Sequence, residues 1–403
     1  MKLKTILMAG AMAIAASGAS AACSYENEVP LKSLSAGFEA WKAVTDAMAE
    51  CGNFSASLDQ EFREKQPEAF AADPSLYQIG GVANETMIPL LNAGTIRPLD
   101  DLVAKYGQDL LPNQLIKVDG KVMAIAMMVN AQHLMYRNDV LADLGIEEPA
   151  TYDDVLAAAA KIKEAGVMEY PIGGTFKTGW NLAQEFVNMY MGEGGTFIGE
   201  GNMPSINNEK GVKALETMKA MTEFMDPEYL VSDSTYVQQQ FQQGKIAMAN
   251  LWASRAAAMN DEAESQVVGK VTMASAPMGS ERPSTTIWWD GIVLASNMSD
   301  EEADAAFRLV MEGIDGDMVS ANNDTAVWLN AAYKPGDLAA GAAASAENGA
   351  GAYPASAAMG VLHSALGNGL ADYLTGAKDA QTALADIEAD YITAAKEAGL
   401  ISN

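Results

Sequence analysis

Histidine, the commonest general base and a frequent metal ligand in enzymes, occurs only twice in this 403-residue chain. His133 and His363 lie in separate segments, and neither stands at metal-ligand spacing from another histidine or cysteine. The sequence also lacks the motifs of zinc proteases, dithiol oxidoreductases, phosphate-binding loops, dinucleotide-binding folds and serine hydrolases. A glycosidase needs only two carboxylates, so that class stays open in a chain with 53 acidic residues. We nevertheless expect a protein that is not an enzyme and that uses no cofactor and no metal ion.

Basic residues are scarce as well. The chain has 25 lysines and arginines against 53 acidic residues, which gives a formal net charge of −28 at pH 7. A surface of this sign repels phosphate backbones and anionic lipid. We therefore expect no nucleic-acid partner.

Apolar runs of membrane length are missing. Lys2 and Lys4 provide a positively charged start, and Leu3–Ala16 supplies an apolar run that is too short to span a bilayer. This run leads to the signal-peptidase-like residues 19–21. Residues 1–21 are therefore predicted to be a signal peptide that directs the mature chain to the periplasm. A lipoprotein anchored through Cys23 is the less favoured alternative, because Ser20 stands where a lipobox prefers leucine.

Cysteine is limited to one pair, Cys23 and Cys51. In an oxidising compartment an even pair at this spacing predicts one disulfide that closes a moderate loop. By loop-closure entropy such a bond would stabilise the fold by about 3–4 kcal/mol. Two unpaired thiols, or a lipidated Cys23, are the alternatives.

What the chain does contain is an alternation of strand-like and helix-like segments from end to end. Capping-box patterns at Thr151–Asp154 and Ser299–Glu302 mark the starts of two helices, and Gly166 marks the end of the first. Alternation of this kind predicts an α/β fold with mostly parallel strands. The length of the mature chain favours two lobes over one compact core.

Tryptophan in polar, turn-like surroundings is the second positive feature. A tryptophan face stacks on the C–H face of a sugar ring, while Asp, Asn and Gln satisfy the hydroxyls. The same residues could cage a quaternary ammonium by cation–π attraction, and packing in the core is the alternative for each ring. The six tryptophans are Trp41, Trp180, Trp252, Trp288, Trp289 and Trp328.

Several segments together resemble a known family by their order and spacing. They are Asn92–Asp100, Asp119–Ala124, Leu134–Asp139, Leu144–Asp153, Gln243–Met248 with Trp252, and Trp289–Gly291. In these segments the chain resembles the family 1 extracellular solute-binding proteins, the periplasmic receptors of carbohydrate ABC importers, which include maltose-binding protein. The resemblance covers nearly the whole mature chain.

The resemblance implies a type II periplasmic binding protein with two lobes. Each lobe is expected to be a mostly parallel sheet flanked by helices, with the ligand cleft between the lobes. The first lobe would comprise residues 22–129 plus about 290–335. The second lobe would comprise residues 130–289 plus about 336–403.

The resemblance also suggests roles for individual residues. Asn130 matches a polar hinge position, Trp252 matches a stacking tryptophan, and Asn84 with Glu85 follows the second strand, where hydroxyl ligands commonly lie. The family's hinge proline is Ala126 here, which puts the exact solute in doubt. The predicted ligand-binding residues are Trp41, Asn84, Glu85, Asn130, Trp180, Asn181, Trp252, Trp288, Trp289, Asp290, Trp328 and His363.

These expectations combine into one function. The protein is expected to be a monomer that binds a mono- or small oligosaccharide by hinge closure and delivers it to an ABC permease. The alternative is a receptor of the same fold for a non-sugar solute, such as a betaine or a polyamine.

Overall fold

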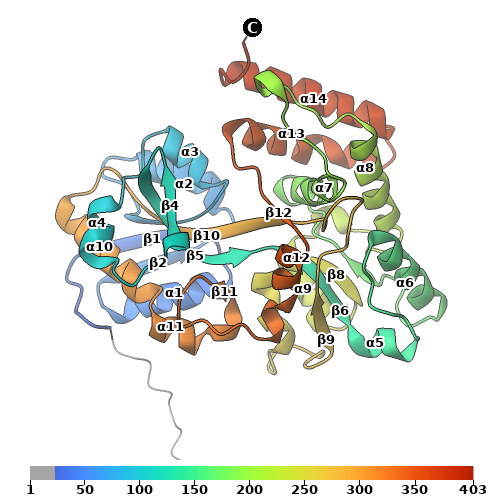
Figure 1. Cartoon of the computed structure of the whole chain (residues 1–403), viewed down its shortest axis with the longest axis horizontal. Helices are drawn as coiled ribbons and strands as arrows, with labels where there is room; N and C mark the ends of the chain where they lie inside the picture. Colours follow the sequence, from blue (N-terminus) through green and yellow to red (C-terminus); the bar gives the residue numbers. More distant parts are fainter. Residues whose placement is uncertain (1–22, 403) are drawn as a thin grey trace, which may run out of the picture.

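The computed structural model describes residues 23–402, so the predicted signal peptide lies outside the described residues. These residues form two α/β lobes that lie side by side, with two long strands running between them (Figure 1). Within the described part of the chain, no helix is long and apolar enough to cross a membrane.

The first lobe is built on the larger sheet, which has eight strands when β12, at the second-lobe end of β10, is included. The strand order is β11-β5-β10-β3-β1-β2, with β4 paired to β5 and β12 paired to β10. The strands are β1 (Leu31–Ser35), β2 (Phe54–Leu58), β3 (Ile79–Ala83), β4 (Leu115–Val118), β5 (Lys121–Asn130), β10 (Thr286–Leu294), β11 (Val327–Trp328) and β12 (Gly351–Ala352).

Helices cover both faces of this sheet; in Figure 1, α2 and α3 lie above it and α1 and α11 below it. Helix α1 buries one stripe, which includes Trp41, Val44 and Met48, because residues three and four apart share a face. The helices of this lobe are α1 (Glu39–Glu50), α2 (Phe62–Ala71), α3 (Met87–Asn92), α4 (Asp100–Tyr106), α10 (Asp300–Gly313) and α11 (Gly316–Ala321).

The second lobe has a smaller sheet with the order β7-β8-β6-β9 and a larger set of helices. Its strands are β6 (Gln132–Arg137), β7 (Ile172–Gly173), β8 (Met248–Trp252) and β9 (Val271–Ala274). Its helices are α5 (Asn138–Asp143), α6 (Tyr152–Glu164), α7 (Trp180–Gly192), α8 (Glu209–Thr222), α9 (Ser234–Gln242), α12 (Ala340–Glu347), α13 (Ala357–Leu374) and α14 (Ala380–Glu397).

The expectation of mostly parallel sheets is wrong, since both sheets are mixed. Strand β10 runs antiparallel to β3 and β5, and β6 runs antiparallel to β8 and β9. Strands β4 and β5 are antiparallel as well, because they are joined by the tight turn Asp119–Gly120, in which both residues have positive φ. A two-residue turn makes an antiparallel hairpin, whereas a parallel pair needs a long crossover.

The chain passes between the lobes where β5 ends at Asn130 and β6 begins at Gln132. It passes again along β10, where Trp288 pairs with Asn130 and the next residues join the first sheet. After β11 the chain reaches α12, which packs on β6 and β9 of the second lobe. The lobe boundaries expected from the resemblance stay a prediction.

Three local predictions are confirmed. Cys23 and Cys51 form a disulfide with their Cα atoms 5.1 Å apart, which ties the start of the described chain to the end of α1. The side chains of Thr151 and Ser299 cap α6 and α10, and both capping boxes are complete.

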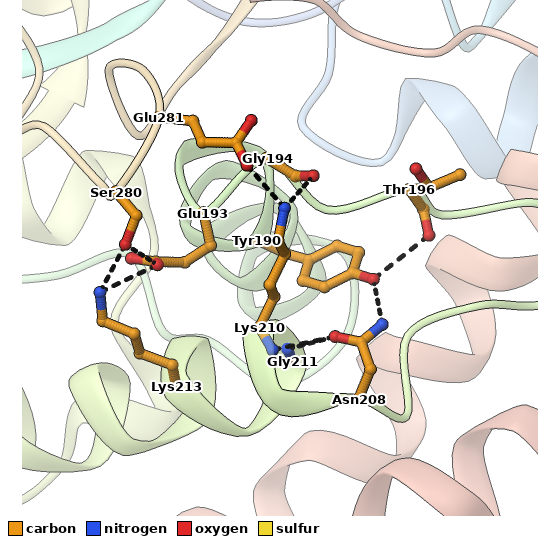
Figure 2. Close-up of polar contacts among 10 residues, drawn as sticks. All are labelled: Tyr190, Glu193, Gly194, Thr196, Asn208, Lys210, Gly211, Lys213, Ser280 and Glu281. Carbon is orange, nitrogen blue, oxygen red and sulfur yellow. Dashed lines mark hydrogen bonds and ion pairs between the residues drawn. The ribbon is translucent and has the colours of Figure 1, made fainter.

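A cluster of polar contacts holds α7 against α8 (Figure 2). The cluster thereby fixes α7, whose first residue is Trp180. Asn208 caps α8 by accepting from the N–H groups of Lys210 and Gly211, and it donates to the Tyr190 hydroxyl at 2.7 Å. Lys210 binds the carbonyl of Gly194 and a carboxylate oxygen of Glu281. Both helices are thereby joined to the loop that precedes β10.

Candidate ligand-binding site

The candidate site is a cavity of about 150 Å³ between the two lobes. Its walls combine aromatic rings with carboxylate, amide, hydroxyl and cationic groups. Residues of the first lobe and of the crossing strands that line it are Ala36, Phe38, Gln60, Phe62, Arg63, Ala83, Asn130, Trp288 and Asp290. Residues of the second lobe that line it are Lys177, Trp180, Asn181, Asp233, Ser234, Thr235, Trp252, Ser254 and Arg255.

Three tryptophans form one cluster at the cavity. The rings of Trp180 and Trp252 are stacked with centroids 6.3 Å apart, and Trp288 meets both edge-on at 5.6 and 6.0 Å. Aromatic rings prefer these offset and edge-to-face arrangements. The cluster gives the second lobe a rigid apolar wall.

Two glycines fix the position of Trp180. Gly179 has φ 97° and ψ −140°, a conformation that side chains disfavour, and its N–H donates to the carbonyl of Gly367 on α13. A Cβ at Gly367 would lie 2.7 Å from the Gly179 oxygen, so the close approach of the two backbones requires glycine at Gly367. Helix α7 therefore begins against α13, with Trp180 as its first residue.

His363, which lies on α13 like Gly367, packs against Trp180. The buried imidazole stacks on the indole with centroids 5.1 Å apart, its Nε2 lies 3.0 Å from the Trp180 carbonyl, and its Nδ1 lies 3.1 Å from the Tyr353 hydroxyl. Burial lowers the pKa of His363, so the ring is neutral. Because a carbonyl only accepts, Nε2 donates to Trp180 and Nδ1 accepts from Tyr353.

The first lobe reaches Trp180 through two side chains. Its indole Nε1 donates a 2.7 Å hydrogen bond to Oε2 of Glu85, which follows β3. The guanidinium of Arg63, on α2, lies 4.3 Å from the centre of a Trp180 ring. The lobes are therefore joined at the cavity by a hydrogen bond and a cation–π contact.

Asp290 lies on β10 at a β-bulge, where the pairing with β5 shifts register. A bulge re-aims a strand side chain, and Asp290 accordingly lines the cavity. Burial raises the pKa of this carboxyl to about 7, although Arg63 favours its ionised form. Hydrogen bonds from Asn130 and Trp41 also favour the carboxylate.

Asn130 connects the two lobes at the end of β5. Its Nδ2 donates to the Ser254 hydroxyl at 3.2 Å, and its Oδ1 accepts from the Ser254 N–H at 3.3 Å. The amide therefore holds the segment that follows Trp252 against the crossing strand.

A sequence model of the bacterial extracellular solute-binding proteins matches residues 68–357. The chain belongs to this family. This solute-binding protein is similar in structure to an ABC transporter solute-binding protein from Agrobacterium radiobacter K84 in complex with ribitol. The TM-score is 0.81 and the sequence identity 22%, and the match covers 92% of this chain and 99% of that chain. It is also similar to maltose-bound MalE3 of T. maritima, with a TM-score of 0.77 and 19% identity, over 90% of this chain and 99% of that chain.

A curated relative matches in sequence. A probable ABC transporter-binding protein of Deinococcus radiodurans is 27% identical over 201 residues, which are 46% of this chain and 46% of that protein. The match with this solute-binding protein thus spans about half the length of the relative.

The structure brings six of the residues predicted from the sequence to the cavity wall. Glu85 contacts Trp180 from the first lobe and His363 contacts it within the second lobe, but neither residue lines the cavity. The six that line it are Asn130, Trp180, Asn181, Trp252, Trp288 and Asp290.

The remaining four predicted residues do not line the cavity of this solute-binding protein. Trp41 and Trp328 are buried in the core of the first lobe, and Trp289 packs against a neighbouring cluster of that lobe. Successive strand residues point to opposite faces, so Trp288 and Trp289 cannot share the cavity. Asn84 is buried beside Glu85, and its Oδ1 has no hydrogen-bond partner among the described residues.

Sequence reasoning missed three cations that line the cavity, Arg63, Lys177 and Arg255. Lys177 pairs with Asp233 at 3.5 Å, and Arg255 donates to Gln238 at 3.0 Å. The available signal was the segment from Trp252 to Arg255, where an arginine follows a predicted stacking residue at the end of a strand. Nothing local to α2 distinguishes Arg63 from the charged residues beside it.

Proposed function

We propose that this protein captures a sugar or polyol between its lobes and delivers it to the permease of an ABC importer. The observation that carries the proposal is the cavity itself, where Trp252 stands among hydrogen-bonding groups from both lobes. Its volume of about 150 Å³ suits a monosaccharide better than a long glycan. Ribitol and maltose in the similar proteins support the same class of solute.

The mechanism is closure around the crossing strands. A solute that touches both lobes binds the closed state better than the open state and so shifts the population toward it. Asp290 and Asn130 lie at the crossings and would accept from and donate to hydroxyl groups. A carboxylate has more acceptor sites than the hydrogen bonds that Asp290 receives from Asn130 and Trp41, so a solute with a matching hydroxyl is favoured over one without it.

The arrangement of the rings argues against a betaine or polyamine. A cation–π cage needs each ring centroid within about 6 Å of a cation that lies between the rings. The centroids of Trp180, Trp252 and Trp288 are only 5.6–6.3 Å from one another, so the rings fill the space that an ammonium group would need. The cation over Trp180 is the protein's own Arg63.

The proposal includes the cellular setting. The family is extracellular, and the signal-peptide pattern of residues 1–21 supports export to the periplasm. We expect a monomer whose partner is the permease, and hinge closure requires no covalent step.

A thermal-shift screen of residues 22–403 tests the proposal. The panel comprises monosaccharides, disaccharides, sugar alcohols, sugar acids, betaines and polyamines. A solute present at 100 times its dissociation constant stabilises the folded state by about 2.7 kcal/mol, which raises the melting temperature measurably. A shift confined to the sugar-derived compounds supports the proposal, whereas a shift only with betaines or amines contradicts it.

A further inference from the structure

Basic residues outnumber acidic residues in the lining of the cavity, whereas acidic residues outnumber basic residues in the whole chain. Three basic residues, Arg63, Lys177 and Arg255, line the cavity against two acidic residues, Asp233 and Asp290. The whole chain has 25 basic and 53 acidic residues. A strongly acidic protein that binds only neutral solutes has no electrostatic need for this reversal, whereas an anionic solute does.

Arg63 is the cation with unused hydrogen-bonding capacity. Its guanidinium lies 4.3 Å from the Trp180 ring centre and 4.7 Å from that of Phe62, contacts that hold the group without using its N–H donors. Its Nε is buried without a hydrogen-bond partner, and Arg63 forms no ion pair within residues 23–402. A fixed guanidinium with free donors matches the two oxygens of a carboxylate.

The acidic neighbours of Arg63 are held by other groups. Glu85 accepts the hydrogen bond of the Trp180 indole, and Asp290 is hydrogen-bonded by Asn130 and Trp41. Burial raises the pKa of Asp290 to about 7, so this carboxyl is partly protonated at neutral pH. Lys177 and Asp233 pair with each other at 3.5 Å. Glu85 and Asp290 attract the guanidinium through space, but neither forms an ion pair with Arg63, so the N–H donors of Arg63 stay available to a solute.

The first turn of α7 adds a second feature that favours an anion. The helix has 13 residues and begins at the cavity, and Gly179 provides no side-chain cap. The N–H groups of Trp180 and Asn181 therefore have no capping partner, and the helix dipole favours negative charge at this end. Arg63 contacts the indole of Trp180, the first residue of this helix, and both residues line the cavity.

We propose that the solute is a sugar acid, a monosaccharide-sized polyhydroxy compound with one carboxylate, and that this carboxylate binds Arg63 beside the first turn of α7. The inference rests on the proposed function and narrows its substrate class. The hydroxyl groups would contact Asp290, Asn130 and the face of Trp252. Arg255 provides a second positive charge on the opposite lobe.

Matched pairs of compounds that differ in the carboxylate test the inference. Galacturonate and galactose, glucuronate and glucose, and gluconate and glucitol are titrated by calorimetry into residues 22–403. We expect at least one acid to bind 100-fold or more tightly than its neutral partner. A bound anion beside Asp290 disfavours the ionised form of this carboxyl. Binding of the acid should therefore be accompanied by proton uptake at Asp290, and the affinity should increase as the pH is lowered from 8 to 6.

Variants identify the binding group. Arg63→Gln should weaken binding of the acid at least 50-fold. It should not raise the affinity for the matched neutral compound to the affinity that the wild type has for the acid. The affinity of Arg63→Lys for the acid should lie between those of the wild type and Arg63→Gln. The control is Arg308→Gln, since Arg308 contacts Tyr25 in the first lobe and does not line the cavity. Circular dichroism and melting temperature verify that each variant folds. An unchanged acid affinity in a folded Arg63→Gln protein overturns the inference.

The outcomes separate this inference from the proposed function. Tight binding of neutral sugars or polyols with no preference for acids overturns the inference and leaves the proposed function intact. Binding of sugar phosphates but not of carboxylates overturns the carboxylate assignment. A response to none of the sugar-derived compounds contradicts both.

Discussion

The indole of Trp180 donates a 2.7 Å hydrogen bond to Glu85 and thereby joins helix α7 of the second lobe to the loop after β3 in the first. Arg63, which lines the cavity, also lies over the same indole. Trp180 was predicted to stack on a sugar, but its ring is already in contact with Arg63 and His363. In this conformation Trp180 connects the second lobe to Glu85 and Arg63 of the first lobe.

Removal of the Glu85 carboxylate should favour the open state. A hydrogen bond to a charged group contributes about 1.5–3 kcal/mol, so Glu85→Ala should weaken solute binding roughly ten-fold or more. Small-angle scattering of the solute-free protein should show a larger radius of gyration than the wild type. Glu85→Gln retains an acceptor and should have a smaller effect. Equal radii and equal affinities in all three proteins would show that the contact does not influence closure.

Trp252 is the ring that we expect to stack on the solute. Trp252→Ala should weaken binding by about ten- to a hundred-fold, because stacking area and ring-specific attraction are both lost. Trp289→Ala is the matched control, since this tryptophan packs against the first lobe outside the cavity. Calorimetry with the solute identified by the thermal-shift screen measures both. A larger loss in the Trp289 variant would place the binding surface elsewhere.

Glu185 predicts a pH dependence of stability. It is buried on α7 and accepts hydrogen bonds from Gln132 and Thr175. Burial raises its pKa from 4.5 to about 7. The native state therefore holds a proton that the unfolded state loses, so this residue lowers the free energy of unfolding as the pH rises from about 4.5 to about 7.

The substitution Glu185→Gln should remove this loss, because the amide oxygen can still accept both hydrogen bonds. We expect the variant to be more stable than the wild type by about 1–3 kcal/mol at pH 8 and equally stable near pH 4.5. Urea denaturation at the two pH values measures the difference. Because Asp290 titrates in both proteins, it cancels in the comparison. A gain that is the same at both pH values would contradict the assignment to Glu185.

The disulfide should contribute substantially to stability. Cys23 and Cys51 are 28 residues apart in sequence, and a loop of this length predicts about 3–4 kcal/mol from the restricted unfolded chain. The double variant Cys23→Ser with Cys51→Ser should unfold at correspondingly lower urea concentration. A reducing agent should lower the stability of the wild type to that of the variant and should leave the variant unchanged.

Features with local or family-wide patterns could be predicted from the sequence. The capping boxes at Thr151 and Ser299 depend on residues three apart, and the cysteine pair needs only spacing and compartment. Sheet direction could not be predicted in the same way, because alternation does not show how distant strands pair. Strand β10 joins the first sheet antiparallel to β3 and β5 after the chain has passed through the second lobe.

The cavity was predictable only in part, since long-range packing decides which side chains reach it. Trp288 and Trp289 are adjacent in sequence, and only the register of β10 decides that the first joins the cavity. Trp328 has a similar context but packs in a core, where its Nε1 donates to the Asn322 carbonyl. Arg63 faces the cavity only because α2 packs on the first sheet, which no pattern in that helix indicates.

The most direct test of the central claim is a crystal structure of residues 22–403 grown with the sugar or sugar acid that gives the largest thermal shift. The account predicts that the solute lies between the lobes, against Trp252, with its polar groups on Asp290 and Arg63. A solute bound outside this cavity, or one that touches a single lobe, would contradict it.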